Sequence, residues 1–462
     1  MTIVSQLKKI VGKENVTDKR NDLLVYGLDW TRFHEPDPLA IVFVRTIDQV
    51  IKLVRFARKK RIGLVPSGGR TGLSGGACAT NGEVVVSFKK MNRVLGFSRT
   101  DASITVQPGV ITANLQNYVQ EKGFFYPVDF ASSGSSHIGG NVATNAGGIR
   151  VLRYGMTRDW VSGLKVVTGA GEVINLNKGL IKNNTGYDLR HLFIGSEGTL
   201  GFVVEATLQL APPIGSLTVV LLSIPMPEAC LEVLGVFREF VTLTAFEFFS
   251  HNALHFVVTR YDLKTPFKVS APFYILLEFE SSRERALSDA LEACSRCSKH
   301  GSVLDAIVAS NEQQNRSLWQ YREKITESIT HRTPYKNDIS LKVSCVPRFL
   351  LKVQELIEKN YPSFEIVWFG HVGDGNLHLN ILRPEEMSAD RFKIKCREVN
   401  DNIIRVVLEL EGSISAEHGI GLLKKEQLHF THSQQDIETL KSIKLIFDPD
   451  GIMNPGKLLE GS

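Results

Sequence analysis

Two histidines flank a tight turn in the segment GHVGDGNLHLN (residues 370–380), and imidazole is a common ligand of divalent metals. His371 ends one predicted strand and His378 lies on the next, with an Asp-Gly-Asn turn between them. Neutral imidazoles suit zinc, manganese, cobalt or iron(II), and Glu417 in SAEHGIG offers a third ligand. Two histidines and one carboxylate leave positions open for a substrate. A histidine pair on a hairpin is often only packed and hydrogen-bonded, so spacing alone leaves both interpretations open.

Three segments of the first half are dense in glycine and in Ser, Thr and Asn donors. They are PSGGRTGLSGGA (66–77), GSSHIGGNVATNAGG (134–148) and GSEGTLG (195–201). Glycine lets backbone N–H groups turn toward an anion and lets a pyrophosphate approach closely, so three such loops favour a large phosphate-bearing cofactor over ordinary turns. None is a strand–GxGxxG–helix unit with an acidic residue about 20 positions on, and a P-loop is absent, so a Rossmann site is not indicated.

The pattern of strands and helices that must position these residues predicts an α+β protein of several domains. Up to the Pro-Pro pair at 212–213, short strands and glycine-rich loops follow a strand at 39–46 and a basic helix at 47–63. From 214 to 424, strand–helix–strand patterning indicates an antiparallel sheet with helices on one face. The stretch 425–462 contains a helix and a turn-rich tail.

Composition excludes several classes of protein. Hydrophobic residues are 43% and charged residues 22% of the 462, the balance of a soluble globular chain. An apolar run of about 18 residues and a signal peptide are both absent, so we expect a cytoplasmic protein with no membrane span, although peripheral membrane association stays open. The net charge of +5 is scattered, and its densest run, 55–61, reads as a solvated helix face rather than a nucleic-acid patch. The single CxxC, Cys294 and Cys297, lies in a helical pattern and predicts two reduced cysteines.

The glycine-rich segments, PGV at 108–110 and FDPDGIMNPGK near the C-terminus closely resemble the PCMH-type FAD-binding enzymes of the vanillyl-alcohol oxidase family. The resemblance covers nearly the whole chain. It implies a FAD domain of two α/β subdomains over residues 1–213 and a substrate- and metal-binding cap domain over 214–424. It also implies that the segment 425–462 returns to the FAD domain. Members that attach FAD covalently often carry a histidine in the first loop, where this chain has Arg70. Because Cys78 is the only thiol nearby, we expect FAD to be held without a covalent bond.

The resemblance also assigns residues to the cofactor. The first two loops would hold the pyrophosphate and ribityl chain, Ile138, Gly140, Asn141 and Thr144 would lie by the flavin, and Gly198 and Thr199 would cover the adenine end. The full set of implied FAD contacts is Pro66, Ser67, Gly68, Gly69, Arg70, Thr71, Gly72, Leu73, Ser74, Gly75, Gly76, Pro108, Gly109, Ser132, Ser133, Gly134, Ser135, Ile138, Gly139, Gly140, Asn141, Thr144, Asn145, Gly147, Gly148, Tyr154, Gly155, Glu197, Gly198, Gly201, Val203 and Asn454.

GHVGDGNLHLN and SAEHGIG are similar to the metal-dependent D-2-hydroxy-acid dehydrogenase branch of this family. The likeness implies His371, His378 and Glu417 as ligands, with zinc as the first choice and manganese, cobalt or iron admitted. It makes His418 the base and places Asn380 by the substrate. In that branch the α-hydroxyl and α-carboxylate of the substrate chelate the metal, the histidine accepts the hydroxyl proton, and hydride passes from Cα to flavin N5.

Two further segments, LWQYREKITESI and YKNDISLKV, contain residues that could bind the far end of a substrate. Arg322 and Thr326 lie four residues apart, on one predicted helix face, and Lys336 comes just before a strand. Unaided, these residues read as surface salt-bridge formers. The pattern resembles the D-2-hydroxyglutarate dehydrogenases, in which such an arginine, threonine and lysine hold the substrate. The likeness implies oxidation of D-2-hydroxyglutarate to 2-oxoglutarate.

Alternatives stay open at this stage. A D-lactate or glycolate dehydrogenase of the same family would not need a distal cationic cluster. A metal-dependent hydrolase would use the glycine loops for a nucleotide, and a non-redox enzyme or a structural protein could share the flavin fold. The family resemblance implies an electron-transfer flavoprotein or a quinone as electron acceptor, with dioxygen less favoured. The oligomeric state stays open, because no heptad seam marks an interface, and a homodimer is one alternative.

Overall fold

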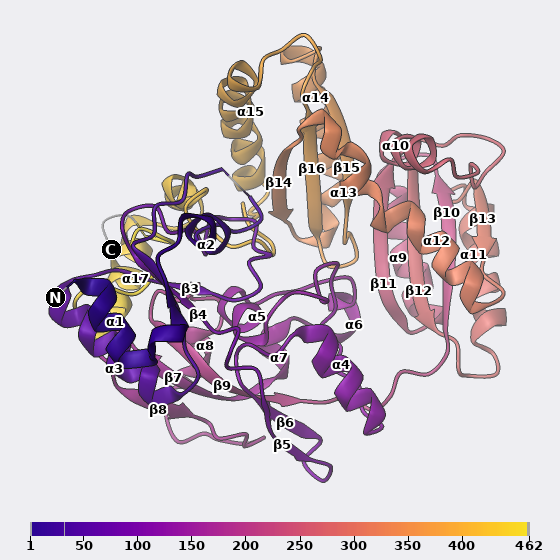
Figure 1. Ribbon diagram of the computed structural model, residues 1–462. Coiled ribbons are helices and arrows are strands. Elements are labelled where there is room, and N and C mark those ends of the chain that lie inside the picture. Colours follow the sequence, from indigo (N-terminus) through magenta and orange to yellow (C-terminus); the bar gives the residue numbers. More distant parts are fainter. Residues whose placement is uncertain (1, 32, 460–462) are drawn as a thin grey trace. The chain divides into compact units, whose positions relative to one another are not determined.

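The computed structural model describes residues 2–31 and 33–459, which form two compact units (Figure 1). The first unit comprises Met1–Gly148, Gly155–Pro213 and Glu417–Ser462, and the second comprises Ile149–Tyr154 and Ile214–Ala416. One change of unit falls at the Pro-Pro pair, where the sequence placed a boundary. The sequence predicted the later change after residue 424, whereas the structure places it after Ala416.

Hydrogen bonds and ion pairs explain both departures from the predicted boundaries. The backbone N–H groups of Ile420 and Gly421 donate to the buried carboxylate of Glu197, at 2.7 and 2.8 Å, so the chain has rejoined the first unit before residue 424. The short segment Ile149–Tyr154 belongs to the second unit because Arg150 pairs with Glu278 there, at 3.2 Å. This excursion was not predicted from the sequence.

The first unit contains two sheets, as expected for two α/β subdomains. The four-stranded sheet has the order β1-β2-β4-β3, in which β2, β4 and β3 are parallel and β1 is antiparallel to β2. Its core is apolar and is covered by helices α1 and α3. The elements of this subdomain are α1 (Ile3–Val11), β1 (Val16–Thr17), α2 (Arg20–Tyr26), β2 (Ala40–Phe43), α3 (Ile47–Lys60), β3 (Leu64–Ser67) and β4 (Val84–Ser87).

The five-stranded sheet of the first unit is antiparallel throughout, in the order β5-β6-β9-β7-β8. It has a second apolar core, into which Phe447 of the C-terminal helix packs. The elements are β5 (Val94–Ser98), β6 (Ser103–Val106), α4 (Thr112–Glu121), α5 (Ile138–Thr144), α7 (Thr157–Trp160), β7 (Val161–Thr168), β8 (Val173–Leu176), α8 (Arg190–Phe193), β9 (Gly201–Gln209), α16 (Leu428–Thr431) and α17 (Gln434–Phe447).

The C-terminal segment returns to the first unit, which confirms the prediction. The buried Lys444 on α17 donates to the carbonyl oxygens of Thr199 and Met453, at 2.7 and 2.8 Å, and pairs with Asp448 at 2.5 Å. Met453 in turn bridges to Leu64 at the start of β3. A buried ammonium with three oxygen partners is satisfied, so this contact holds the tail against the glycine-rich unit.

The second unit is built on a seven-stranded antiparallel sheet in the order β13-β10-β12-β11-β15-β16-β14. The antiparallel pairing confirms the predicted α+β class. Its elements are α6 (Val151–Tyr154), β10 (Leu217–Ile224), α9 (Ala229–Phe240), β11 (Leu243–Ser250), α10 (His251–Tyr261), β12 (Phe273–Glu280), α11 (Ala286–Lys299), β13 (Asp305–Val308), α12 (Glu312–Glu323), α13 (Ile325–Ile329), β14 (Tyr335–Ser340), α14 (Val346–Asn360), β15 (Glu365–Gly370), β16 (Asn376–Leu382) and α15 (Ala389–Glu409). Short 3-10 helices lie at Lys13–Asn15, Thr330–Arg332, Val343–Cys345 and Lys425–Gln427.

Helices pack on both faces of this sheet, whereas the sequence suggested one. Phe249 and Phe369 share a core with Trp319 of α12 on one face. Trp368 points the other way, because side chains alternate along a strand, and its ring lies 6.0 Å from that of Phe349 on α14. All eight residues of β11 are buried, as expected for a strand covered on both sides.

Other sequence predictions can be checked against burial. Most of the basic run on α3 is exposed, and Arg58 pairs with Asp450 at 2.6 Å, so the run is a solvated face. Cys294 and Cys297 lie on the buried side of α11, and burial raises the pKa of each thiol to about 11. Among the residues that the structure describes, none of the helices has the length and apolar character to cross a membrane.

Candidate functional site

His371 and His378 are brought together by the hairpin of β15 and β16, as the sequence suggested. The register pairs Phe369 with His378, and the two imidazole ring centres are 5.5 Å apart. The turn between the strands depends on Gly375, whose φ is +88° and whose Cβ, if present, would lie 2.0 Å from the Leu341 carbonyl oxygen. Any other residue would displace this turn and with it the histidine pair.

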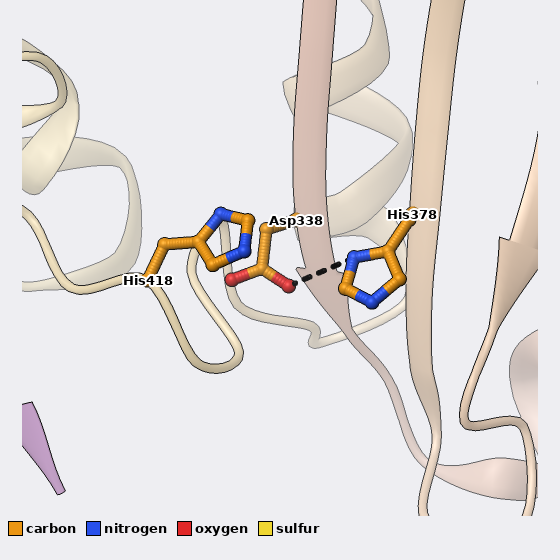
Figure 2. A group of neighbouring side chains, drawn as sticks. All are labelled: Asp338, His378 and His418. Carbon is orange, nitrogen blue, oxygen red and sulfur yellow. Dashed lines mark ion pairs between the residues drawn. The ribbon is translucent and has the colours of Figure 1, made fainter. Parts of the chain in front are cut away.

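Each histidine has a buried carboxylate at its Nδ1 atom. Glu247 Oε1 lies 2.7 Å from His371 Nδ1. Figure 2 shows the second contact, in which Asp338 Oδ1 lies 3.5 Å from His378 Nδ1. Metal-bound histidines almost always direct the second ring nitrogen to a carboxylate, a carbonyl or water, which fixes the tautomer and makes the ligating nitrogen more basic. The sequence interpretation missed both carboxylates.

The third candidate ligand, Glu417, comes directly after the last residue of the second unit. The Ala416 N–H donates to Asp338 Oδ2 across 3.1 Å, and Glu417 and His418 are the next two residues of the chain. One ligand atom from each of His371, His378 and Glu417 lies within 4.8 Å of the others. The chemistry and spacing of this donor set fit a divalent metal of the zinc or manganese type.

Asp338, His378 and His418 form an overlapping group of potential ligands (Figure 2). In that view the Asp338 carboxylate lies between the two imidazole rings. Its oxygens are already engaged, because Oδ1 accepts from Asn376 Nδ2 at 2.8 Å and Oδ2 accepts from the Ala416 N–H. Asp338 therefore suits the role of a supporting carboxylate, and Glu417 suits that of the ligand.

The strand register places two predicted substrate residues on the same face as the histidine. On β14 and β16, Asp338 lies opposite His378 and Lys336 lies opposite Asn380. Side chains two residues apart on a strand share a face, so Lys336 and Asn380 lie one row along from Asp338 and His378. Asn380 is buried. Lys336 as a whole residue is exposed, but protein groups around its ammonium partly desolvate it, and this lowers the pKa of Lys336.

Arg322, on helix α12, is buried and contacts Glu247, the acid beside His371. Its Nε atom forms an ion pair with Glu247 Oε2 at 2.8 Å, and its guanidinium carbon lies 4.8 Å from the centre of the Phe369 ring. Burial alone would raise the pKa of Glu247. The nearby charges of His371 and Arg322 outweigh burial, so the pKa of this carboxyl lies below its usual value.

Thr326 does not share one continuous helix with Arg322, which corrects the sequence prediction. Helix α12 ends at Glu323 and α13 begins at Ile325, on the far side of Lys324. Ile325 packs in the apolar core. Arg322 is buried, whereas Thr326 is exposed.

The three glycine-rich loops of the first unit lie against one another. A Cβ on Gly69 would be 2.2 Å from the Ser135 carbonyl oxygen, which joins the first loop to the second. Gly198 has φ of +73°, and a Cβ there would be 2.6 Å from Pro66 Cγ, which joins the third loop to the first. Only glycine permits both approaches, so the spacing of these residues in the sequence corresponds to one site in space.

Buried polar atoms at these loops fit a polar cofactor. Ser67 Oγ, His137 Nδ1 and Asn454 Oδ1 are buried and lack a hydrogen-bond partner within the described residues. Such atoms are costly unless a bound group supplies a partner. The Asn454 amide nitrogen donates to the carbonyl oxygens of Gly76 and Glu197, at 2.8 and 2.7 Å, and so ties two of the loops together.

Several residues assigned to the cofactor have side chains engaged elsewhere. Ile138 packs in the core of the five-stranded sheet, and Asn141 donates to Thr112 Oγ1 at 2.7 Å. The carboxylate of Glu197 is occupied by the backbone of residues 420–421. Tyr154 belongs to the second unit, unlike the other residues of the set. For Ile138, Asn141 and Glu197, the side chain therefore has a structural partner.

Cys78 is a poor candidate for a covalent flavin link. Its thiol is buried and donates to Asp29 Oδ1 at 3.5 Å. Burial, with the Asp29 charge, raises the pKa of this thiol to about 12. Because the thiolate is the nucleophile, a thiol with so high a pKa is unreactive at neutral pH.

Comparison with known proteins extends these observations. Residues 38–177 match the family profile of the FAD binding domain, and residues 216–458 match that of the C-terminal domain of FAD linked oxidases. The chain is 53% identical over 456 residues to a D-2-hydroxyglutarate dehydrogenase of Stutzerimonas stutzeri (strain A1501), covering 99% of this chain and 98% of that protein. It is 34% identical over 472 residues to the mitochondrial D-2-hydroxyglutarate dehydrogenase of Arabidopsis thaliana, covering 99% and 82%. The fold is similar to that of p-cresol methylhydroxylase, with a TM-score of 0.79 at 15% identity over 98% of this chain and 96% of the other.

Proposed function

The chain belongs to the FAD-linked oxidase family and is an FAD-dependent hydroxy-acid dehydrogenase, and from this premise we propose that it oxidises D-2-hydroxyglutarate to 2-oxoglutarate with the help of a divalent metal. The proposal adds two statements to the family-level activity: which substrate is oxidised, and that a divalent metal takes part. The D-lactate or glycolate dehydrogenase is the competing choice within the family.

The metal half of the proposal rests on the donor set. His371, His378 and Glu417 would hold the ion, and Glu247 and Asp338 would fix the two imidazoles through Nδ1. Zinc or manganese held there would act as a Lewis acid toward the substrate hydroxyl, and FAD would supply the two-electron redox chemistry.

The chain's own residues carry the proton and the orientation of the substrate. We assign to His418 the role of accepting the hydroxyl proton, because a neutral imidazole is a common general base. Asn380, buried on the face shared with His378, would bind the carboxylate end of the substrate.

The cationic groups around the histidines carry the choice of a dicarboxylic substrate. Arg322 and Lys336 approach this face from different elements, and Thr326 follows the helix that bears Arg322. The single observation that carries the proposal is that the buried Arg322 guanidinium and the metal ligand His371 share one carboxylate, Glu247. A guanidinium so close to a metal site is suited to bind the far carboxylate of a short diacid.

An anaerobic flavin-bleaching titration of the metal-loaded protein tests the proposal. We expect rapid bleaching by D-2-hydroxyglutarate, little by L-2-hydroxyglutarate or D-lactate, and loss of bleaching after chelation. Faster bleaching by D-lactate would transfer the assignment to the competing substrate. A flavin that no 2-hydroxy acid reduces would overturn the proposed reaction.

The route of the electrons away from FAD stays a prediction. An electron-transfer flavoprotein or a quinone is the acceptor that the family resemblance implies. The non-covalent attachment of FAD is a further part of the proposal, supported by the buried, high-pKa thiol of Cys78. The cytoplasmic location and the homodimer stay predictions of the same kind.

A further inference from the structure

Glu247 is a fully buried carboxylate that contacts a proposed metal ligand and a proposed substrate ligand at the same time. It lies on β11 with 0% of its surface exposed. One oxygen, Oε1, is 2.7 Å from His371 Nδ1, and the other, Oε2, is 2.8 Å from Arg322 Nε. The two contacts come from His371, the residue directly after strand β15, and from Arg322 on helix α12, which reach the acid from separate parts of the chain.

Burial on this scale makes both contacts necessary. A carboxylate taken out of water is destabilising unless it is paired and hydrogen-bonded, and removal of one partner from a buried pair is strongly destabilising. Glu247 lies in the apolar run LTAFEFFS, in which every residue is buried. The acid therefore has a definite position, and that position constrains both the imidazole and the guanidinium.

Phe369 limits the guanidinium from the other side. Its ring lies 4.8 Å from the Arg322 guanidinium carbon, and its centre is 5.0 Å from that of the His378 ring. The inner nitrogen of Arg322 faces Glu247, so the terminal nitrogens are the part of the fork left to meet a carboxylate. Arg322 is thus held by an acid and an aromatic ring that both adjoin the histidine pair.

We propose that Glu247 is a positioning residue that sets the spacing between the metal ligand His371 and the carboxylate-binding Arg322, and thereby makes the site selective for dicarboxylic 2-hydroxy acids. This inference rests on the proposed function. One oxygen orients the imidazole toward the metal, and the other fixes the guanidinium at the distance of the second carboxylate. A monocarboxylic acid of the same length gains nothing from the second contact.

Glu278 provides a matched control on the neighbouring strand β12. It is also a buried acid in a strand, and it accepts from Thr244 Oγ1 at 2.8 Å and from Trp319 Nε1 at 3.2 Å and pairs with Arg150 at 3.2 Å. None of these partners belongs to the proposed metal or substrate site. Glu278→Gln therefore removes a comparable buried charge without touching the relation between His371 and Arg322.

The experiment measures two binding equilibria that do not require turnover. The first is the affinity of the metal-stripped protein for Zn²⁺, by competition with a chelator. The second is the affinity of the oxidised, metal-loaded protein for 2-oxoglutarate relative to 2-oxopentanoate, by calorimetry. We expect Glu247→Gln to weaken Zn²⁺ binding about 10- to 100-fold, the range found when a carboxylate behind a metal ligand is lost. We expect the same variant to reduce the preference for the dicarboxylate by about 10-fold or more.

The outcomes separate the inference from its rivals. Both shifts in Glu247→Gln, with neither in Glu278→Gln, support the positioning role. A shift in one equilibrium alone, or equal shifts in both variants, overturns it. If Glu247→Gln does not fold, Glu247→Asp keeps the charge but withdraws the carboxylate by one methylene, and the same two shifts at smaller size are expected. Failure of D-2-hydroxyglutarate to bleach wild-type flavin would overturn the proposed function, whereas wild-type binding constants in Glu247→Gln would overturn this inference alone.

Discussion

The Ala416 N–H donates to Asp338 Oδ2 across 3.1 Å, and this bond holds the backbone immediately before Glu417 and His418. The other oxygen of the same carboxylate faces His378 Nδ1 at 3.5 Å. Asp338 therefore orients one proposed ligand directly and a second through the main chain. Because β14 fixes Asp338 opposite His378, the sheet register itself determines this arrangement.

Asp338→Asn should weaken Zn²⁺ binding about 10- to 100-fold, because an asparagine side chain has one acceptor oxygen and a donating NH₂ group, so one of the present donors loses its acceptor. Chelator competition measures the affinity. Glu386→Gln, at an exposed position on the loop after β16, is the control and should bind Zn²⁺ as wild type does. Unchanged affinity in Asp338→Asn would remove Asp338 from the metal site.

The two histidines of the candidate metal site could be recognised from the sequence, but the carboxylates beside them could not. His371 and His378 lie on one hairpin, so local spacing was informative. Glu247 is 124 residues before His371, and only the tertiary fold brings the two together. A signal did exist, because a lone acid inside the buried run LTAFEFFS needs a partner, but nothing in the run identifies which one.

Lys336→Met should lower kcat/KM for D-2-hydroxyglutarate about 10- to 100-fold, the range expected when a charged hydrogen-bonding partner of a carboxylate is removed. Lys336 is exposed, so the substitution should leave the folded state intact. For D-2-hydroxypentanoate, which lacks the second carboxylate, kcat/KM should be unchanged. An equal fall for both substrates would contradict a role at the distal carboxylate. The control is Lys342→Met, at an exposed lysine that pairs with Glu411.

His137 predicts a loss of stability at mildly acidic pH. Burial, with the charges of Arg70 and Lys89, lowers the pKa of this imidazole to about 4, against 6.5 in the unfolded chain. Because this pKa is lower in the folded state, the unfolded chain takes up a proton at His137 at a higher pH than the folded protein does. The free energy of unfolding is therefore unaffected by His137 above pH 6.5 and decreases as the pH falls from 6.5 toward 4.

Urea unfolding at pH 7 and pH 5 measures this effect. Wild type should lose about 2 kcal/mol of unfolding free energy between the two values through His137. His137→Gln, which cannot be protonated, should lose correspondingly less. If the variant and wild type respond equally to pH, another group is responsible for the acid sensitivity.

The fold was easier to predict than the course of the chain between the two units. Glycine spacing and strand patterning are local, and they indicated the loops and the antiparallel sheet of the second unit, whereas the two α/β subdomains of the first unit were implied by the family resemblance. The excursion Ile149–Tyr154 depends on ion pairs of Arg150 and Arg153 with acids on β12, which are more than a hundred residues away. The break between the two helices at Lys324 was likewise not predicted, because no helical periodicity reveals it.

Glu197→Gln should impair catalysis by releasing the segment that follows His418. The buried carboxylate accepts from the N–H groups of Ile420 and Gly421, at 2.7 and 2.8 Å, and Gly419 packs against it. An amide keeps one acceptor and turns a donor toward the other N–H, which costs about 1–3 kcal/mol for the unsatisfied pair. We expect faster hydrogen exchange at Ile420 and Gly421 and a fall in kcat, while the flavin content stays at one per chain. Glu172→Gln, at an exposed position of the same unit, should change none of these quantities. Loss of flavin with unaltered exchange at residues 420–421 would instead assign the Glu197 side chain to the cofactor, as the sequence resemblance suggested.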